Sequence, residues 1–242
     1  MSSPTDNNNT FLLSSPTTTT TPWAWLKAMN DILINPPFEE PTSFPLELKP
    51  SWLFLSDVMS LSTNKLMDLG ITHILTTNKM ASSSSLERLQ TRFKRAGIVH
   101  GFVEGEDEVG YDMLGKHWET CKEFILEAKR QYGESAKIIV HCAAGQNRSG
   151  LIVAATMLTF WKQEEEKPTL LNIIQYLKAK RGIVLTNLSF QRQLCIFAAQ
   201  HDCLGEKPEG YTDTPLPESN FQPHTQTTSI KHRYSNDPFD FR

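Results

Sequence analysis

The stretch IIVHCAAGQNRSG, residues 138–150, is the part of the sequence that decides the fold. It opens with a short apolar run of branched side chains, which predicts a buried strand, and its last residues begin an apolar helical pattern. A tight loop between a strand end and a helix N-terminus points backbone N–H groups inward, and the helix dipole adds partial positive charge there. The stretch therefore predicts a cradle for an anion such as a phosphate group.

The loop carries residue types suited to phosphoryl transfer. Cys142 stands at the base of the cradle, where the same donors stabilise a thiolate that can attack phosphorus. Arg148, six residues later, has a planar fork that matches two phosphate oxygens and stabilises charge in the transition state. Ser149 can donate to the sulfur and make it a better leaving group. His141 is expected to order the loop rather than to act in catalysis.

The rest of the loop is predicted to surround the bound phosphate. Gly145 permits a backbone conformation or a close approach that a side chain would obstruct. Apart from the arginine, these side chains are uncharged, whereas a site for multiply phosphorylated inositol lipids or RNA ends would gain from extra Lys or Arg. The composition therefore favours a singly phosphorylated residue in a protein. The predicted substrate-binding residues are Ala143, Ala144, Gly145, Gln146, Asn147 and Arg148.

Strand and helix patterns alternate around this stretch. Apolar, branched runs predict strands at residues 52–55, 71–77, 98–103 and 137–141. Helical patterns are predicted at residues 60–70, 85–95, 112–132, 148–161, 169–181 and 187–203. Strands that alternate with helices imply a mostly parallel sheet with helices on both faces. We therefore expect a three-layer α/β domain.

Both ends of the chain differ in composition from this domain, which is expected to span residues 46–204. Residues 1–45 are expected to form a disordered tail that contains a short helix near residues 22–34. That helix could dock onto the domain or onto a partner. Residues 205–242 are rich in Pro, Thr and Ser, and are expected to form a second disordered tail.

The bulk composition limits the class of protein. With 39% hydrophobic and 21% charged residues, and no run of about 18 apolar residues, a soluble protein without a membrane span is predicted. The net charge of −3 argues against a nucleic-acid partner held by bulk electrostatics. Four cysteines without metal-ligand spacing favour a reducing compartment, so we expect the cytoplasm and/or the nucleus. A Ser/Thr-rich plastid transit peptide is the alternative interpretation of the N-terminus.

The loop residues match HCxxGxxRS, the signature of the cysteine-dependent phosphatases, and the surrounding chain resembles the dual-specificity branch of that family. The resemblance extends over residues 46–204. It includes SWLFLSDVMSLSTNKLMDLGITHIL at residues 51–75 and AKRGIVLTNLSFQRQL at residues 179–194. Thr186 stands where the family has Pro, so the turn at this position is expected to differ.

The resemblance also implies a general acid. In the family, an Asp on a loop a little over thirty residues before the cysteine protonates the leaving group. Residues 104–112 of this chain hold several carboxylates. Asp107 is the predicted acid, because the family often shows a second Asp or Asn five residues later and Asp112 occupies that place. Glu108 is the alternative, and Asp112 itself is interpreted as a helix N-cap.

The resemblance therefore implies a dual-specificity protein phosphatase, a hydrolase that works through a phosphocysteine intermediate without metal or organic cofactor. Its expected partner is a phosphorylated protein. Phosphotyrosine, phosphoserine and phosphothreonine are all open as substrates, and the oligomeric state is not indicated. Two other functions are compatible with a phosphate cradle: an adaptor that binds phosphorylated partners without turnover, and a phosphatase for a small molecule or phospholipid.

Overall fold

A computed structural model describes residues 20–36, 44–80, 82–161 and 168–217. Its centre is a five-stranded sheet with the order β1-β2-β5-β3-β4. The strands are β1 (Leu46–Glu47), β2 (Leu53–Asp57), β3 (His73–Thr76), β4 (Val99–Phe102) and β5 (Ile138–Cys142). All neighbouring pairs are parallel except β1 and β2, which are antiparallel. The predicted strands are present, and β1 is an additional edge strand that the sequence did not indicate.

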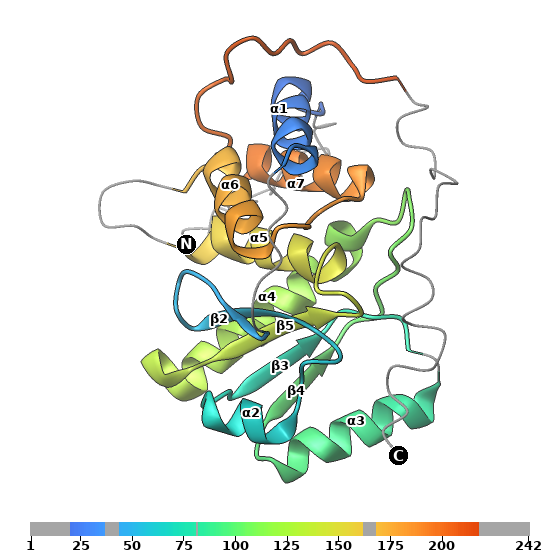
Figure 1. The fold of residues 1–242 in the computed structure, drawn as a ribbon, viewed down its shortest axis with the longest axis vertical. Helices are drawn as coiled ribbons and strands as arrows, with labels where there is room; N and C mark the ends of the chain where they lie inside the picture. Colours follow the sequence, from blue (N-terminus) through green and yellow to red (C-terminus); the bar gives the residue numbers. More distant parts are fainter. Residues whose placement is uncertain (1–19, 37–43, 81, 162–167, 218–242) are drawn as a thin grey trace, which may run out of the picture.

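Helices cover both faces of this sheet (Figure 1). The predicted three-layer α/β fold is therefore confirmed. The helices are α1 (Trp23–Ile34), α2 (Thr63–Asp68), α3 (Ser83–Arg95), α4 (Met113–Tyr132), α5 (Arg148–Phe160), α6 (Leu170–Arg181) and α7 (Leu188–Gln200), with a short 3-10 turn at Gly133–Ser135. None of the helices in the described ranges is both long enough and apolar enough to cross a membrane.

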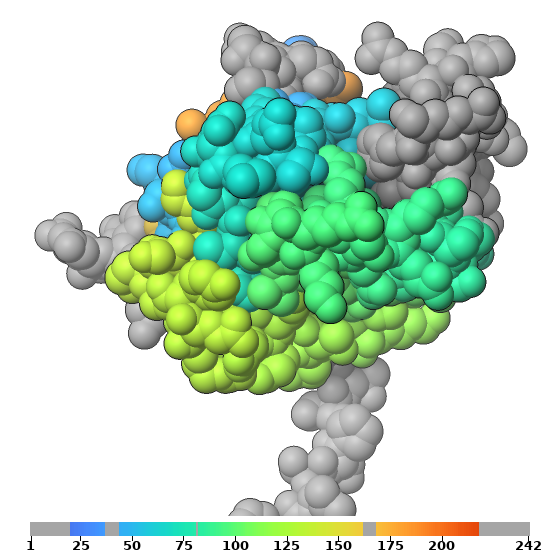
Figure 2. Space-filling model, turned by 90° about the horizontal axis from the view of Figure 1, so that it is seen from below, coloured from blue at the N-terminus to red at the C-terminus, as the bar shows by residue number. Residues whose placement is uncertain are grey.

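Side chains from successive strand positions enter two different apolar clusters. Phe54, Ile74 and Ile139 point from β2, β3 and β5 toward Leu66 of α2 and Phe93 of α3. Seen from below, the cyan to green residues that include these two helices form a continuous surface (Figure 2). The opposite face of the sheet packs against the larger cluster formed with α4 to α7. Its contributors from the strands are Leu53, Leu55, Leu75 and Val140.

The helix ends show how local sequence sets the boundaries. The side chain of Asp112 accepts a hydrogen bond from the backbone N–H of Gly115 at 2.9 Å, as expected for the N-cap of α4. Ser82 caps α3 in the same way through the N–H of Ser85. The helix expected from Ser60 begins only at Thr63. The α2 boundary therefore lies inside the predicted range.

Helix α1 packs on α6 and α7 and belongs to the main core of the domain (Figure 1). Its Leu26, Met29 and Leu33 side chains are buried there. The ammonium of Lys178 on α6 donates to the carbonyl of Leu33, at 2.9 Å, and so satisfies one of the open carbonyls at the end of α1. The helix expected near residues 22–34 is therefore present, and it docks onto the domain, which is one of the two possibilities that the sequence left open.

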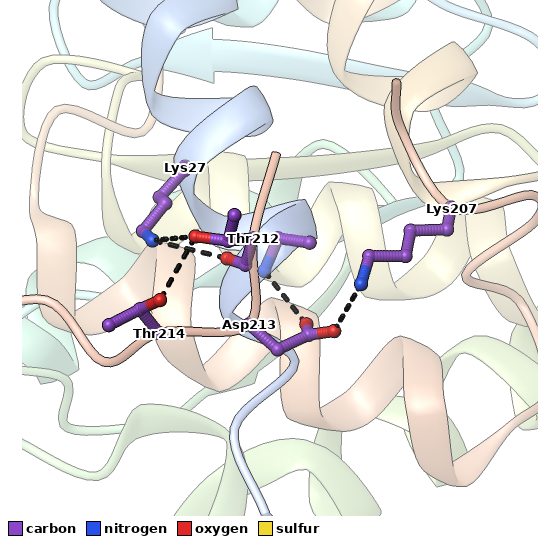
Figure 3. Close-up of polar contacts among 6 residues, drawn as sticks. Lys27, Lys207, Thr212, Asp213 and Thr214 are labelled. Carbon is purple, nitrogen blue, oxygen red and sulfur yellow. Dashed lines mark hydrogen bonds and ion pairs between the residues drawn. The ribbon is translucent and has the colours of Figure 1, made fainter. Parts of the chain in front are cut away.

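Residues 205–217, which we name the C-terminal strap, are bonded to α1 through Tyr211, Thr212 and Asp213. The Asp213 carboxylate accepts from the backbone N–H of Ala24 at 3.2 Å and pairs with Lys207 at 2.6 Å (Figure 3). The ammonium of Lys27 donates to the Thr212 carbonyl at 3.1 Å. Because the α1 N-cap residue, Pro22, offers no side-chain acceptor, the strap supplies one from the far end of the sequence.

The strap revises the expected tail at residues 205–242. The composition of this segment, rich in Pro and Thr, is typical of disorder, but side-chain bonds to α1 fix the part that the structure describes. The disorder predicted for residues 1–19 and 218–242 lies outside the described residues.

Candidate active site

Cys142 is the last residue of β5, the strand at the middle of the parallel part of the sheet. It follows that the sulfur lies at the carboxyl edge of the strands, where α/β proteins commonly bind ligands. The residue is only 1% exposed. The hydroxyl of Ser149, in the first turn of α5, donates to its Sγ at 3.1 Å. The structure therefore brings the predicted nucleophile and its predicted hydrogen-bond donor together.

The loop that follows, residues 143–147, has its carbonyls bonded to groups outside it. Arg181 donates from Nε to Gly145 O at 3.1 Å and from Nη2 to Ala144 O at 3.0 Å. The backbone N–H groups of Val58 and Leu185 donate to Ala143 O and Gln146 O, each at 3.3 Å. A peptide unit whose carbonyl points outward turns its N–H inward, so this arrangement aims consecutive N–H groups at the loop centre.

Gly145 has the geometry that the sequence predicted. Its φ is +64°, in the left-handed region that favours glycine. A Cβ atom at this position would lie 2.8 Å from the carbonyl oxygen of Ser56 on β2. A side chain there would push the loop away from the sheet.

Arg148 begins α5 and reaches across the loop. Its Nη1 donates to Gly105 O at 3.2 Å, which ties the guanidinium to the acidic segment at residues 104–112. Its Nε is buried and has no hydrogen-bond partner among the described residues. An unpaired buried donor is unfavourable, so a bound anion that accepts from it would be stabilised.

Asp107 is the acid of this segment whose carboxylate reaches the loop. Its Oδ2 accepts from Nδ2 of Asn147 and its Oδ1 accepts from Nδ2 of Asn187, both at 3.1 Å. Glu106 is instead paired with Lys79 at 2.8 Å, and this hydrogen bond holds the pKa of the Glu106 carboxyl below its usual value. Glu108 meets the amide of Asn187 through its backbone carbonyl, at 3.3 Å. Of the two predicted candidates, Asp107 is the one whose carboxylate is bonded to the loop among the described residues.

Comparison with known proteins shows to which family the chain belongs. A model of the family described as "Dual specificity phosphatase, catalytic domain" matches residues 53–200. The chain belongs to the dual specificity phosphatase family. It is 36% identical over 143 residues to dual specificity protein phosphatase 26 of Rattus norvegicus and of Homo sapiens, a match that covers 59% of this chain and 62% of each relative. Identity to dual specificity protein phosphatase 1 of Arabidopsis thaliana is 32% over 143 residues, covering 59% of this chain and 63% of that protein.

The chain thus spans less than two thirds of the length of these relatives.

Solved structures show the same fold. The crystal structure of a mouse putative dual specificity phosphatase complexed with zinc tungstate has a TM-score of 0.51 and 20% identity, covering 71% of this chain and 99% of that one. The crystal structure of human DUSP28 has a TM-score of 0.50 and 19% identity, covering 68% of this chain and 99% of that one.

Behind Cys142 lies a chain of buried polar groups. Nε2 of His141 contacts Thr76 Oγ1 at 2.7 Å, and the same hydroxyl contacts Nε2 of His100 at 2.8 Å. Burial lowers the pKa of His141 to about 3 and that of His100 to about 4. Both rings are therefore neutral near pH 7 and act as hydrogen-bonding groups that fix the end of β5.

Two residues that bond to the loop at residues 143–147 were not identified as site residues from the sequence. The Oδ1 of Asn78 accepts from the N–H of Ala143 at 2.9 Å, and Asn78 is 2% exposed. Arg181 is 3% exposed and holds the loop carbonyls described above. Asn78 follows β3 at the carboxyl edge, a position that could have marked it. Arg181 lies on a distant helix, and no local pattern links it to the loop.

Cys121, Cys195 and Cys203 belong to the hydrophobic core. All four cysteines are free and buried. Burial raises the pKa of the Cys121 thiol to about 12 and also raises that of Cys195. Cys203 donates to the carbonyl of His201 at 3.3 Å. The thiols of Cys121 and Cys195 therefore stay protonated near neutral pH and are poor nucleophiles.

Proposed function

We propose that this chain is a cysteine-dependent protein phosphatase that hydrolyses phosphotyrosine and/or phosphoserine and phosphothreonine. The observation that supports it is the meeting of three groups at one loop. The Cys142 sulfur lies at its base, the buried Nε of Arg148 lacks an acceptor among the described residues, and the Asp107 carboxylate is bonded to the loop through Asn147. The three groups are a nucleophile, a hydrogen-bond donor for the bound phosphate and a proton donor. Phosphoryl transfer from an ester needs this set.

In the first proposed step, the Cys142 thiolate attacks the phosphorus atom in line with the ester oxygen. The sulfur–phosphorus bond forms while the bond from phosphorus to the ester oxygen breaks, and Asp107 transfers its proton to the departing oxygen. The inward N–H groups and the Arg148 guanidinium hold the three remaining phosphate oxygens. The product is a phosphocysteine and a free hydroxyl group on the substrate.

In the second proposed step, water attacks the phosphocysteine. The Asp107 carboxylate, now ionised, accepts a proton from the water as its oxygen bonds to phosphorus. The sulfur leaves with the bonding electron pair, and the hydroxyl of Ser149 at 3.1 Å stabilises the negative charge that develops on it. Inorganic phosphate is released and the site returns to its starting state.

The proposed substrate is a protein that carries one phosphate at the reacting residue. The side chains of residues 143–147 are all uncharged, which suits a single phosphate group better than a multiply phosphorylated headgroup. The proposed compartment is the cytoplasm and/or the nucleus, supported by four free thiols in the described part of the chain.

The test is hydrolysis of a phosphotyrosine peptide and a phosphothreonine peptide, across pH, by the wild type, Cys142→Ser and Asp107→Asn. We expect Cys142→Ser to abolish turnover and Asp107→Asn to slow it about 100-fold. Binding of phosphopeptides by the wild type without any turnover would favour an adaptor. Faster turnover of inositol or sugar phosphates than of either peptide would favour a small-molecule or phospholipid phosphatase.

A further inference from the structure

Two asparagine side chains from different parts of the chain converge on the carboxylate of Asp107. Asn147 comes from the phosphate-binding loop and Asn187 from the N-cap of α7. We propose that these two asparagines are positioning residues, which hold the Asp107 carboxylate over the phosphate-binding loop so that it can protonate poor leaving groups. This inference rests on the proposed function, because it assigns roles around its general acid.

The orientation of the Asn147 amide is fixed by its neighbours. Its Oδ1 accepts from the backbone N–H of Asn187 at 3.2 Å and from the hydroxyl of Thr186 at 3.1 Å. A backbone N–H can only donate, so the amide oxygen must face it. The Nδ2 group is therefore turned toward Asp107, where a carboxylate is the matching acceptor.

The Asn187 amide is fixed in a similar way. Its Oδ1 caps α7 by accepting from the N–H of Ser189 at 3.0 Å and from the hydroxyl of the same residue at 2.7 Å. Its Nδ2 group then has only one direction left, toward Asp107 Oδ1 and the carbonyl of Glu108. Both oxygens of the Asp107 carboxylate thus face amide groups whose directions are set by the backbone.

The turn before α7 explains how this arrangement is reached. Leu185 has a φ of +51°, a conformation unusual for a bulky side chain, and its carbonyl accepts from Nε2 of the buried Gln191 at 2.8 Å. Thr186, which follows it, bonds to Asn147 through a hydroxyl that a proline would lack. Proline there would also disfavour the Leu185 conformation. The departure from the family pattern at Thr186 therefore coincides with the contact that orients Asn147.

The position of the Asp107 carboxylate depends mainly on its bonds to Asn147 and Asn187. The residue is exposed, on a segment with the exposed residues Glu108 to Gly110 directly after it. A carboxylate on such a segment would otherwise sample many directions, and general acid catalysis requires it within hydrogen-bond reach of the leaving oxygen. Two amide donors restrict it to the rim of the loop before the substrate arrives.

The test uses substitutions that remove the Nδ2 donor of each asparagine, and two of them keep the Oδ1 acceptor. Asn147→Asp and Asn187→Asp retain an oxygen for the bonds to Asn187 N–H and Ser189 N–H, but place an acceptor where Nδ2 faced Asp107. Asn147→Ala removes the donor without adding charge. The matched control is Asn172→Asp, on the exposed side of α6, nine residues from Arg181 and so about 13 Å along the helix from the loop.

The readout is the dependence of kcat on the leaving group, because a general acid matters most when the departing oxygen is strongly basic. The substrates would be aryl phosphates with different leaving groups. The pKa of the leaving phenol would range from about 4, as in dinitrophenol, to about 10, as in phenol. For phenyl phosphate we expect kcat to fall about tenfold in each Asn147 variant and in Asn187→Asp, against about 100-fold in Asp107→Asn. For dinitrophenyl phosphate, Asn187→Asp should stay within about twofold of the wild type, and the loss of kcat in Asn147→Ala should be smaller than with phenyl phosphate.

Each outcome has one meaning. A uniform loss with all leaving groups, including in Asn147→Ala, would overturn the inference, because it would show a role in phosphate binding or folding instead. So would wild-type behaviour of all three variants. Wild-type turnover that survives Cys142→Ser would instead refute the proposed function. Melting temperatures of the variants equal to that of Asn172→Asp would show that the kinetic effects do not arise from unfolding.

Discussion

The guanidinium of Arg181 donates from its Nε to the carbonyl oxygen of Gly145 at 3.1 Å. Its Nη2 donates to the preceding carbonyl, of Ala144, at 3.0 Å. Arg181 therefore holds two adjacent peptide units of the phosphate-binding loop with their N–H groups turned inward, and it places a positive charge behind them. The loop depends on a residue about forty positions later in the chain.

Substitution of Arg181 tests this dependence. Arg181→Lys keeps the charge but cannot make two diverging bonds in a fixed plane, so one buried carbonyl loses its donor. Hydrogen bonds to charged groups contribute about 1.5–3 kcal/mol, so kcat/KM should fall at least about tenfold. Inhibition by inorganic phosphate should weaken in parallel. Arg95→Lys, at an exposed position of α3, is the control and should behave as wild type. Full activity of Arg181→Lys would contradict the assigned role.

The Ser149 hydroxyl should matter in the second chemical step more than in the first. Ser149→Ala removes the hydroxyl that donates to the Cys142 sulfur and that, in the proposed mechanism, stabilises the departing thiolate. We expect phosphocysteine to accumulate, with a burst of about one equivalent of product followed by a steady rate roughly tenfold lower than that of the wild type. Rapid-quench measurements with an aryl phosphate would show it. A slower burst with an unchanged steady rate would assign Ser149 to the first step instead.

The buried histidines predict how stability depends on pH. Burial lowers the pKa of His100 to about 4 and of His141 to about 3, whereas both titrate near about 6.5 in an unfolded chain. The unfolded chain binds more protons in this window. Their contribution to stability is therefore complete above about pH 6.5 and decreases, by up to about 1.4 kcal/mol per pH unit for each ring, as the pH falls toward 4.

Urea unfolding of His100→Phe at pH 7.5, 6.5 and 5.5 checks this prediction. The substitution keeps an aromatic ring beside Phe93, whose centroid lies 5.2 Å from that of His100. We expect the variant to lose less stability than the wild type between pH 6.5 and 5.5. An unchanged pH dependence would show that His100 is not buried in the neutral form.

The C-terminal strap should stabilise α1 without contributing to turnover. Asp213→Ala removes the acceptor for the Ala24 N–H and the partner of Lys207. A capping carboxylate at a helix N-terminus is stabilising, so the melting temperature should fall. Glu209→Ala lies on the same strap with an exposed side chain and serves as the control. A loss of kcat in Asp213→Ala at a temperature where it is folded would show that the strap also affects the site.

Local sequence was sufficient to predict the elements around Cys142. It was insufficient to predict strand β1 and the contact of Arg181 with the loop. The strand, loop and helix around Cys142 follow from a continuous apolar run and a dense signature, and the Asp112 cap follows from a single position. Strand β1 is only two residues long, so its existence depends on the edge of β2 rather than on its own pattern. Arg181 reaches the loop from another helix, and only tertiary packing brings it there.

The strap escaped prediction for a related reason. Its composition is polar and Pro-rich, which in isolation is typical of disorder. The bonds that fix it join residues far apart in sequence, such as Tyr211 to Asp31, whose hydroxyl-to-carboxylate distance is 2.8 Å. No window of the sequence contains both partners.

The position of α1 also determines the order in which a growing chain can finish folding. Its partners lie 145 to 189 residues later, at Lys178, Leu204 and Asp213. At a synthesis rate of about 5–20 residues per second, the last of them is made roughly 10–40 s after α1. Until α6 and α7 have been made, the apolar face of α1 lacks the helices on which it packs. Among the described helices, α1 is thus synthesised first and is one of the last to be fully packed.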